Sequence, residues 1–237
     1  MKKYLLILVF VMIYVSSHSQ TAIEYFLKGK SLFESQEYNE AIIEFTNSIK
    51  LNSEFVRAYQ GRGYSKSKLG NFEGALLDYN KSIELQPRNA KYYSRRGIAK
   101  YELGDFKGSI DDFTKEIELG PEKGAMAYVN RARSKASLDD FEGAILDHTA
   151  IIEKYPEFQG AYSGRAIFKK YLGDFNGALE DHNKQIRLNP EIGLFYYLRG
   201  DLKYNMGQIN GACIDWEKAF ELGDEDAKLK YQKNCEK

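Results

Sequence analysis

The sequence lacks the features that most directly mark a catalytic or nucleic-acid-binding protein. It contains no CxxC pair, no glycine-rich phosphate loop and no activated serine, so we expect no enzymatic activity and no cofactor. Its 34 lysine and arginine residues balance 34 aspartate and glutamate residues, which leaves no basic field for nucleic acid and no acidic tail. Nothing in this composition departs from that of an ordinary globular protein.

Histidine is scarce, and this limits the scope for a metal or acid–base site. His148 and His182 occupy one position of an internal repeat, and each follows an aspartate. A metal or acid–base pair is one interpretation. Two histidines without a third ligand make a poor metal site. We therefore predict that both replace an aromatic residue in the core and that the chain has no metal site.

Long apolar runs are absent except at the N-terminus. There, MKK precedes an apolar run over residues 4–15. Ser17 and Ser19 provide small residues at the −3 and −1 positions of a cleavage site, so we interpret residues 1–19 as a secretory signal peptide. We expect an exported protein, periplasmic or extracellular, with no membrane span after cleavage. An uncleaved anchor is the alternative, although the run is short for a bilayer span.

Proline is also scarce, and all four prolines occupy the same position of a repeat. The stretch RGIAKYELGDFKGSIDD, residues 96–112, returns along the chain with a period of 34 or 35 residues, which indicates a solenoid. In this copy Gly104 can end the first helix, Asp105 can cap the second, and Pro121 stops it. The four prolines are Pro87, Pro121, Pro156 and Pro190.

The recurring positions resemble the tetratricopeptide repeat family, in its secreted bacterial type. The first helix (helix A) of each copy has a small residue such as Gly97 four residues after Tyr93, and the second (helix B) has Ser109 four residues before Phe113. The resemblance implies an all-α, right-handed α-solenoid of six helical hairpins with a C-terminal capping helix. We predict six repeats over residues 20–226 (22–55, 56–89, 90–123, 125–158, 159–192 and 193–226) and a capping helix over 227–237.

One departure from the family is an arginine before the small helix-A residue, followed four residues later by a lysine. Arg96 and Lys100 are one such pair, and Asp78 lies in the preceding helix B. An antiparallel register between that helix and the next helix A would bring the three together on one face. We therefore predict ion pairs between successive repeats. Pairing inside one repeat, which would place Asp78 nearer Lys66, is the alternative.

The two cysteines lie near the C-terminus. Cys213 and Cys235 are symmetric about Asp224, so an antiparallel helix pair would place them opposite each other. In an oxidising compartment we predict a disulfide that fastens the capping helix. The alternative is two reduced cysteines, one of them buried.

The resemblance implies a concave groove, lined by outward helix-A positions, that binds extended peptides or helices. These positions are rich in basic and aromatic residues although the whole chain is neutral, so our hypothesis is a partner with acidic or carboxylate groups. The carboxylate clamp of some family members is incomplete here, because Gly61 and Lys30 stand where asparagines are expected. The predicted groove residues are Arg57, Tyr64, Lys91, Arg95, Tyr101, Asn130, Arg133, Lys170, Tyr171, Tyr197 and Tyr204.

We predict a protein–protein interaction scaffold or assembly factor of the cell envelope that binds another protein or an extended peptide. An envelope glycan-binding protein, or a weak hydrolase using the tyrosine-rich groove, is the alternative function. Contact through the convex face or the end of the array, a merely solvated groove and self-association also stay open. We expect no nucleic-acid partner.

Overall fold

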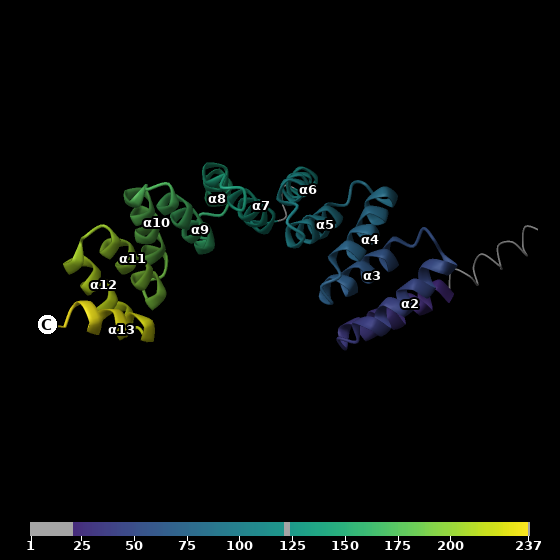
Figure 1. The fold of residues 1–237 in the computed structure, drawn as a ribbon, viewed down its shortest axis with the longest axis horizontal. Coiled ribbons are helices and arrows are strands. Elements are labelled where there is room, and N and C mark those ends of the chain that lie inside the picture. The colour runs from purple at the N-terminus through teal and green to yellow at the C-terminus, as the bar shows by residue number, and fades with distance from the viewer. Residues whose placement is uncertain (1–20, 121–123, 237) are drawn as a thin grey trace, which may run out of the picture. The chain divides into compact units, whose positions relative to one another are not determined.

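The computed structural model describes residues 21–120 and 124–236, and these ranges contain helices, turns and short loops but no strand (Figure 1). The predicted signal peptide lies outside the described residues. The predicted all-α repeat solenoid is confirmed. Among the described helices, none combines the length and the apolarity that crossing a membrane requires.

The chain divides into two compact units, residues 1–123 and 124–237. In each unit every helix packs against the next one along the chain. The first unit contains a helical segment over residues 21–34, then α2 (Tyr38–Leu51), α3 (Val56–Lys68), α4 (Phe72–Leu85), α5 (Ala90–Glu102) and α6 (Phe106–Leu119). The second contains α7 (Met126–Ala136), α8 (Phe141–Lys154), α9 (Gln159–Tyr171), α10 (Phe175–Leu188), α11 (Gly193–Asn205), α12 (Ile209–Glu221) and α13 (Glu225–Asn234).

The turns between α5 and α6 and between α9 and α10 are each built from a glycine, an aspartate and a second glycine. Gly104 follows α5 with φ of 79°, a left-handed conformation that glycine adopts without strain. The Asp105 side chain then accepts a hydrogen bond from the Gly108 N–H at 2.9 Å and caps α6. A Cβ on Gly108 would lie 2.2 Å from Asp105 Oδ2, so a larger residue there would require the Asp105 side chain to shift.

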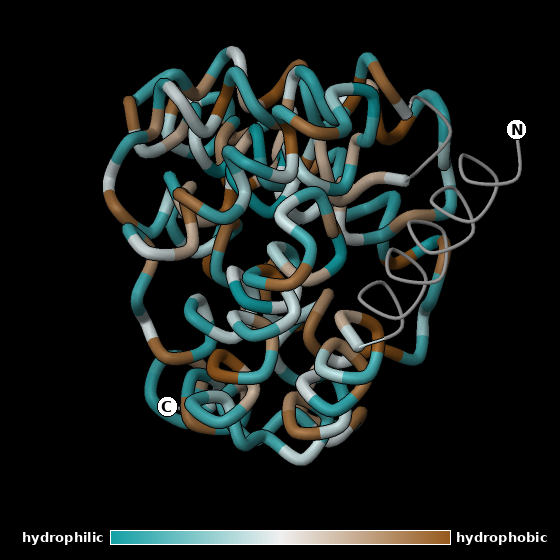
Figure 2. The backbone as a smooth tube through the Cα atoms, turned by 90° about the vertical axis from the view of Figure 1, so that its right-hand side faces the viewer, coloured by the Kyte–Doolittle hydropathy of each residue, from teal (hydrophilic) through white to brown (hydrophobic). Residues whose placement is uncertain are grey.

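Small residues of helix A receive large residues of helix B, and this contact forms the core of each hairpin. A Cβ on Gly63 would lie 2.8 Å from the Tyr79 ring, and one on Gly200 would lie 2.8 Å from the Trp216 ring. Tyr79 and Trp216 are almost completely buried. Apolar and polar residues alternate along the helices, as expected of elements that bury one stripe (Figure 2).

The recurring arginine and lysine bind the aspartate of their own repeat, so the predicted pairing between successive repeats is wrong. Arg62 Nη2 lies 2.6 Å from Asp78 Oδ1, and Lys66 Nζ lies 2.8 Å from Asp78 Oδ2. Arg62 and Asp78 are 16 residues apart with Gly70 midway, so the hairpin turn brings them together. The turn inside a repeat and the loop between repeats both allow a symmetric antiparallel register of their flanking helices. The sequence spacing alone could not decide between these two registers. The other sets are Arg96–Lys100–Asp112, Arg131–Lys135–Asp147, Arg165–Lys169–Asp181 and Arg199–Lys203–Asp215.

The arginine also reaches the preceding repeat, but through a neutral side chain. Arg62 Nη1 donates to Thr46 Oγ1 at 3.2 Å, and Arg96 Nη1 donates to Asn80 Oδ1 at 2.8 Å. Each of these guanidinium groups therefore links two successive hairpins while its charge is balanced inside one of them.

Candidate binding surface on the helix-A face

The first unit has a hollow on its helix-A face, between residues 21–34, α3 and α5. Its cavity volume is 310 Å³. We call it the Gly61 hollow, because at this glycine the Phe45 ring packs directly against the backbone of α3. A Cβ on Gly61 would lie only 2.4 Å from Phe45 Cζ. The lining residues are Phe26, Lys30, Phe33, Phe45, Arg57, Gln60, Gly61, Tyr64 and Arg95.

Three stacked groups form one wall of the Gly61 hollow. The rings of Phe33 and Tyr64 lie 4.9 Å apart with an interplanar angle of 29°. The Arg95 guanidinium lies over the Tyr64 ring, with Cζ 3.8 Å from the ring centroid. Stacking of this kind is a favourable cation–π arrangement. The wall therefore joins one residue from each of three successive repeats.

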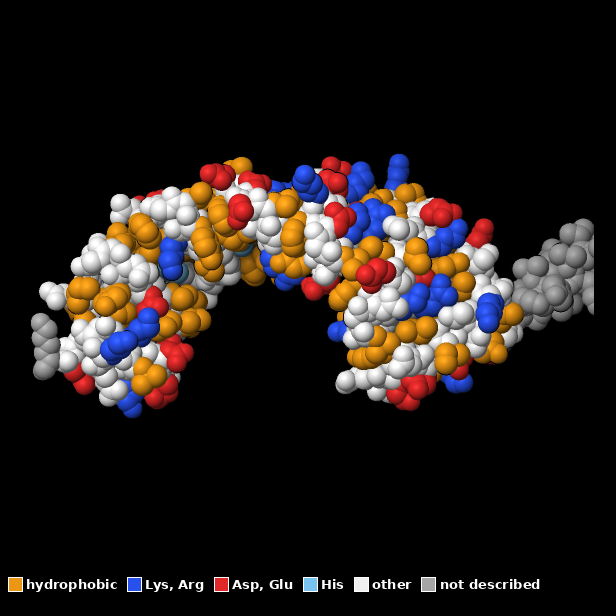
Figure 3. All heavy atoms as spheres, in the orientation of Figure 1, with side chains coloured by type: hydrophobic (Ala, Val, Ile, Leu, Met, Phe, Trp, Pro, Cys, Tyr) orange, Lys and Arg blue, Asp and Glu red, His pale blue; other side chains and the backbone are white. Residues whose placement is uncertain are grey.

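The lining of the Gly61 hollow carries positive charge and no negative charge. Lys30, Arg57 and Arg95 contribute cations, and none of the described lining residues is an aspartate or glutamate. Lysine and arginine side chains border apolar ones on the visible face of the first unit (Figure 3). The surface can therefore attract anionic groups while it offers an apolar floor.

Arg95 also changes the chemistry of the tyrosine it covers. A hydrogen bond from the guanidinium, aided by its charge, lowers the pKa of the Tyr64 hydroxyl, and Lys68 acts in the same direction. Burial opposes this effect. The direction of the pKa change shows that positive charge dominates at this wall.

Five predicted groove residues belong to the first unit, and three of them line the hollow. These three are Arg57, Tyr64 and Arg95. Lys91 is exposed on the first turn of α5 and is not among the lining residues. The Tyr101 ring packs 5.2 Å from the Phe106 ring at the turn between α5 and α6.

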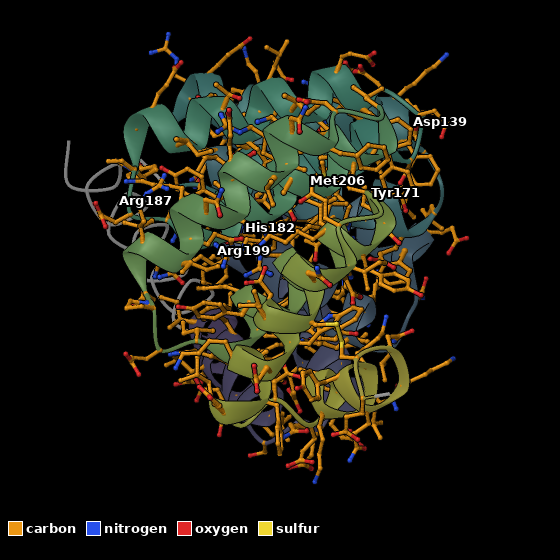
Figure 4. The ribbon with its side chains drawn as sticks, turned by 90° about the vertical axis from the view of Figure 1, so that its left-hand side faces the viewer. Asp139, Tyr171, His182, Arg187, Arg199 and Met206 are labelled. Carbon is orange, nitrogen blue, oxygen red and sulfur yellow. A yellow bond between two sulfur atoms is a disulfide. The ribbon has the colours of Figure 1, made fainter. Side chains whose placement is uncertain are left out.

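The predicted groove residues of the second unit are divided among separate features. Tyr197 and Tyr204 line a hollow of 550 Å³ between α11 and α13, whereas Lys170 lines one of 130 Å³. The Tyr171 ring lies flat on the Phe141 ring at 5.0 Å, with its other face open to solvent, and Figure 4 labels it. Asn130 and Arg133 are on α7, and Arg133 is exposed.

The hollow between α11 and α13 differs from the Gly61 hollow in charge. Its lining includes Asp226 beside Lys230 and Lys233. Lys230 Nζ lies 3.2 Å from Asp201 Oδ1 and 5.7 Å from the Trp216 ring. The capping helix thus supplies its own cation to this aromatic floor.

The two repeat histidines are buried residues of the second unit. His148 and His182 are 5% and 7% exposed, in the positions that Phe45 and Tyr79 occupy in the first unit. His182, labelled in Figure 4, has its Nδ1 2.9 Å from Gln185 Oε1. Desolvation lowers the pKa of both histidines, that of His148 to about 4. Among the described residues no group of three or more histidine, cysteine, aspartate or glutamate side chains could hold a metal ion.

A disulfide joins Cys213 to Cys235, the pairing expected from the sequence. It connects α12 to the residue that follows α13. Ala227 is the one α13 residue that is fully buried, and Leu229 is 65% exposed. Ala227 and the partly buried Tyr231 make the apolar contact of the capping helix with the cluster around Trp216.

The sequence prediction missed the floor of the Gly61 hollow. Gly61 was interpreted only as a departure from the family's carboxylate clamp, and neither Phe33 nor Phe45 was placed in the groove. A glycine at a helix-A position where four of the other five repeats carry larger residues is the signal that could have located the hollow. The corresponding residues of other repeats are Leu27, Arg95, Asn130, Gly164 and Leu198.

The comparisons with known proteins agree with this arrangement of helical hairpins. A family model described as TPR repeat matches residues 64–104. The crystal structure of a tetratricopeptide repeat protein from Parabacteroides merdae is 22% identical and covers 89% of this chain and 83% of its own, with a TM-score of 0.60. YrrB, described as a TPR protein with an unusual peptide-binding site, is 20% identical over 80% of this chain and 97% of its own, with a TM-score of 0.61.

A third similar structure contains a bound peptide. The first TPR of Spaghetti (RPAP3), bound to the HSP90 peptide SRMEEVD, is 26% identical over 51% of this chain and 95% of its own, with a TM-score of 0.50. No curated protein matches the sequence. The helices, their repeated contacts and these similarities define an α-helical repeat fold. Residues 64–104 match the tetratricopeptide repeat family, and the described helices have the fold of tetratricopeptide repeat proteins.

Proposed function

We propose that this protein is an envelope scaffold or assembly factor that binds an extended acidic segment of a partner protein on the helix-A face of its first unit. The observation that carries the proposal is the lining of the Gly61 hollow, which joins three cations to an aromatic floor and contains no carboxylate among the described residues. Bidentate bonds from arginine to carboxylates give such a surface its preference for acidic groups. Two similar structures, one with a peptide-binding site and one with a bound peptide, support a peptide as the ligand.

Charge reversal on the helix-A face tests this proposal. We would immobilise the protein and compare it with a variant carrying Arg57→Glu and Arg95→Glu in capture from the envelope fraction of its source cell. A matched control carries Lys50→Glu and Lys107→Glu, which make the same charge change at exposed positions on α2 and α6. The proposal expects one partner that binds the protein and the control but not the Arg57/Arg95 variant, and that elutes as salt is raised.

Retention of the same proteins by all three baits would contradict an acidic segment at this site. Retention by none of them would contradict a scaffold of the envelope.

Export from the cytoplasm is a separate part of the proposal. It is supported by the basic and apolar pattern of residues 1–15 and by the small residues before Gln20. N-terminal sequencing of the protein isolated from the envelope or medium should begin at Gln20. An intact N-terminus in the cytoplasmic fraction would contradict export, and an intact N-terminus in the membrane fraction would favour the uncleaved anchor.

A further inference from the structure

Two hollows on this face are lined by residues at the same helix-A position, in α3 and in α11. At that position of α3 the residue is Gly61, and the hollow measures 310 Å³. At the same position of α11 the residue is Leu198, which lines a hollow of 130 Å³ over His182. At Gly61 the Phe45 ring occupies the space that a side chain of α3 would take. The edge of this core ring therefore forms part of the lining of the Gly61 hollow.

The residues around the floor make the Gly61 hollow a preformed apolar pocket. Phe26 lies 5.9 Å from Phe45 and 5.1 Å from Phe55, measured between ring centroids. The opposite wall is the stack of Phe33, Tyr64 and Arg95 described above. These contacts hold the aromatic side chains without a ligand, so binding need not order them. A volume near 300 Å³ is at the lower end of the range for small-molecule sites, which suits one side chain better than a folded surface.

The rim of the pocket is cationic, whereas its floor is apolar. Arg57 comes from the first turn of α3 and Arg95 from α5, while Lys30 comes from the first helical segment. Arg57 and Lys30 are exposed, and Lys30 Nζ lies 3.5 Å from Glu34 Oε1. A ligand that matches both parts must carry an apolar group between negative charges.

We infer that the Gly61 hollow binds one large apolar side chain, of leucine or phenylalanine size, from an acidic protein segment whose flanking carboxylates pair with Lys30, Arg57 and Arg95. The inference rests on the proposed function and specifies the partner's sequence: an apolar residue inside an acidic stretch. An aromatic or aliphatic anchor in a desolvated pocket supplies a large share of binding energy, whereas exposed ion pairs supply little. The anchor would therefore determine specificity and the cations would determine orientation and association rate.

Short synthetic peptides provide the probe. Each peptide consists of aspartate and glutamate around one central residue, which is leucine in one and alanine in the other, and binding to the full chain is measured by fluorescence anisotropy at low salt. The leucine peptide should bind about tenfold more tightly, because alanine leaves the pocket unfilled. The variant with Arg57→Glu and Arg95→Glu should bind both peptides more weakly. The control with Lys50→Glu and Lys107→Glu should bind both with unchanged affinity.

A filled pocket should remove the preference without removing charge attraction. Gln60→Trp places a large side chain in the lining of the pocket. It should reduce the affinity of the leucine peptide to that of the alanine peptide. The thermal unfolding temperature of this variant checks that it folds. A third peptide with a photoreactive leucine at the centre requires no substitution, and its crosslinks should fall on residues 21–34 and α3.

The outcomes separate the two proposals. Equal affinity of the leucine and alanine peptides, with both weakened by the arginine variant, would overturn the inference and leave the proposed function standing. Crosslinks outside the pocket would have the same meaning. If neither peptide binds, or if both bind the arginine variant as well as the native chain, both proposals are overturned.

Discussion

The Arg96 guanidinium donates two hydrogen bonds to the buried Asp112 carboxylate, from Nε at 2.9 Å and from Nη2 at 2.6 Å. Lys100 Nζ lies 2.9 Å from the same carboxylate. Asp112→Ala should lower the free energy of unfolding by about 3 kcal/mol, the lower end for a broken buried pair, because both cations keep about one-fifth of their surface in water. Urea unfolding followed by circular dichroism measures the change.

Asp111 is the matched control for this prediction. It precedes Asp112 on α6 and its side chain is exposed. Asp111→Ala removes the same charge and should change the free energy of unfolding by less than about 0.5 kcal/mol. Equal effects of the two substitutions would show that the paired carboxylate does not stabilise the hairpin.

The hairpins could be predicted from the sequence because their signals act locally. Gly104 and Asp105 define the turn between α5 and α6 through backbone conformation and a cap bond within the next few residues. Such signals need no knowledge of distant residues. The partner of Asp78 could not be predicted in this way. An arginine lies beyond the turn that precedes Asp78 and another beyond the loop that follows it, at similar distances along the chain, and the packing of the helices decides which one pairs with it.

The binding surface could be predicted only in outline. Arg57, Tyr64 and Arg95 follow from the helix-A register, and the structure brings them together around one hollow. The floor of that hollow depends on the Phe45 ring passing beneath Gly61, a contact between separate repeats. Glycine in a sequence reports missing volume but not which ring lies below it, so the pocket required the packed structure.

Asp139 should gain stability when replaced by glycine. It has φ of 59° at the hairpin turn where Gly70, Gly104 and Gly173 have φ between 76° and 79°. A left-handed conformation strains a residue with a Cβ, although glycine loses part of the gain through its freer unfolded chain. Asp139→Gly should raise the free energy of unfolding by up to about 1 kcal/mol, and Gly104→Ala should lower it by at least as much. A lower melting temperature for Asp139→Gly would contradict the strain argument.

His148 should make the second unit less stable in mild acid. Desolvation lowers its pKa to about 4 in the folded protein, with Arg165 acting in the same direction and Asp147 and Asp181 opposing. The unfolded chain, with a histidine pKa near 6.5, binds a proton first as the pH falls. The contribution of neutral His148 to the free energy of unfolding is therefore complete above pH 6.5. It falls by about 1.4 kcal/mol per pH unit between pH 6.5 and about 4. Urea unfolding at a series of pH values measures this slope.

His148→Phe should remove that pH dependence without disrupting the packing. The His148 ring lies beneath Gly164 as the Phe45 ring lies beneath Gly61, so the position accommodates phenylalanine in another repeat. The substitution also removes Nδ1, which is buried and has no hydrogen-bond partner in the described structure. The difference in stability between variant and native chain should grow as the pH falls from 6.5 to 4. A constant difference over this range would show that His148 does not titrate as proposed.

Reduction of the Cys213–Cys235 disulfide should release the capping helix before the rest of the second unit unfolds. The disulfide closes a loop of 22 residues, for which chain entropy predicts a stabilisation of about 3 kcal/mol. α13 contributes little apolar burial to replace it, since only Ala227 is fully buried. Hydrogen exchange over residues 225–234 should become faster when dithiothreitol is added, while exchange in α8 and α9 should stay the same. A variant with Cys213→Ala and Cys235→Ala should exchange fast with or without dithiothreitol, and slow exchange of α13 in that variant would show that packing alone holds the helix.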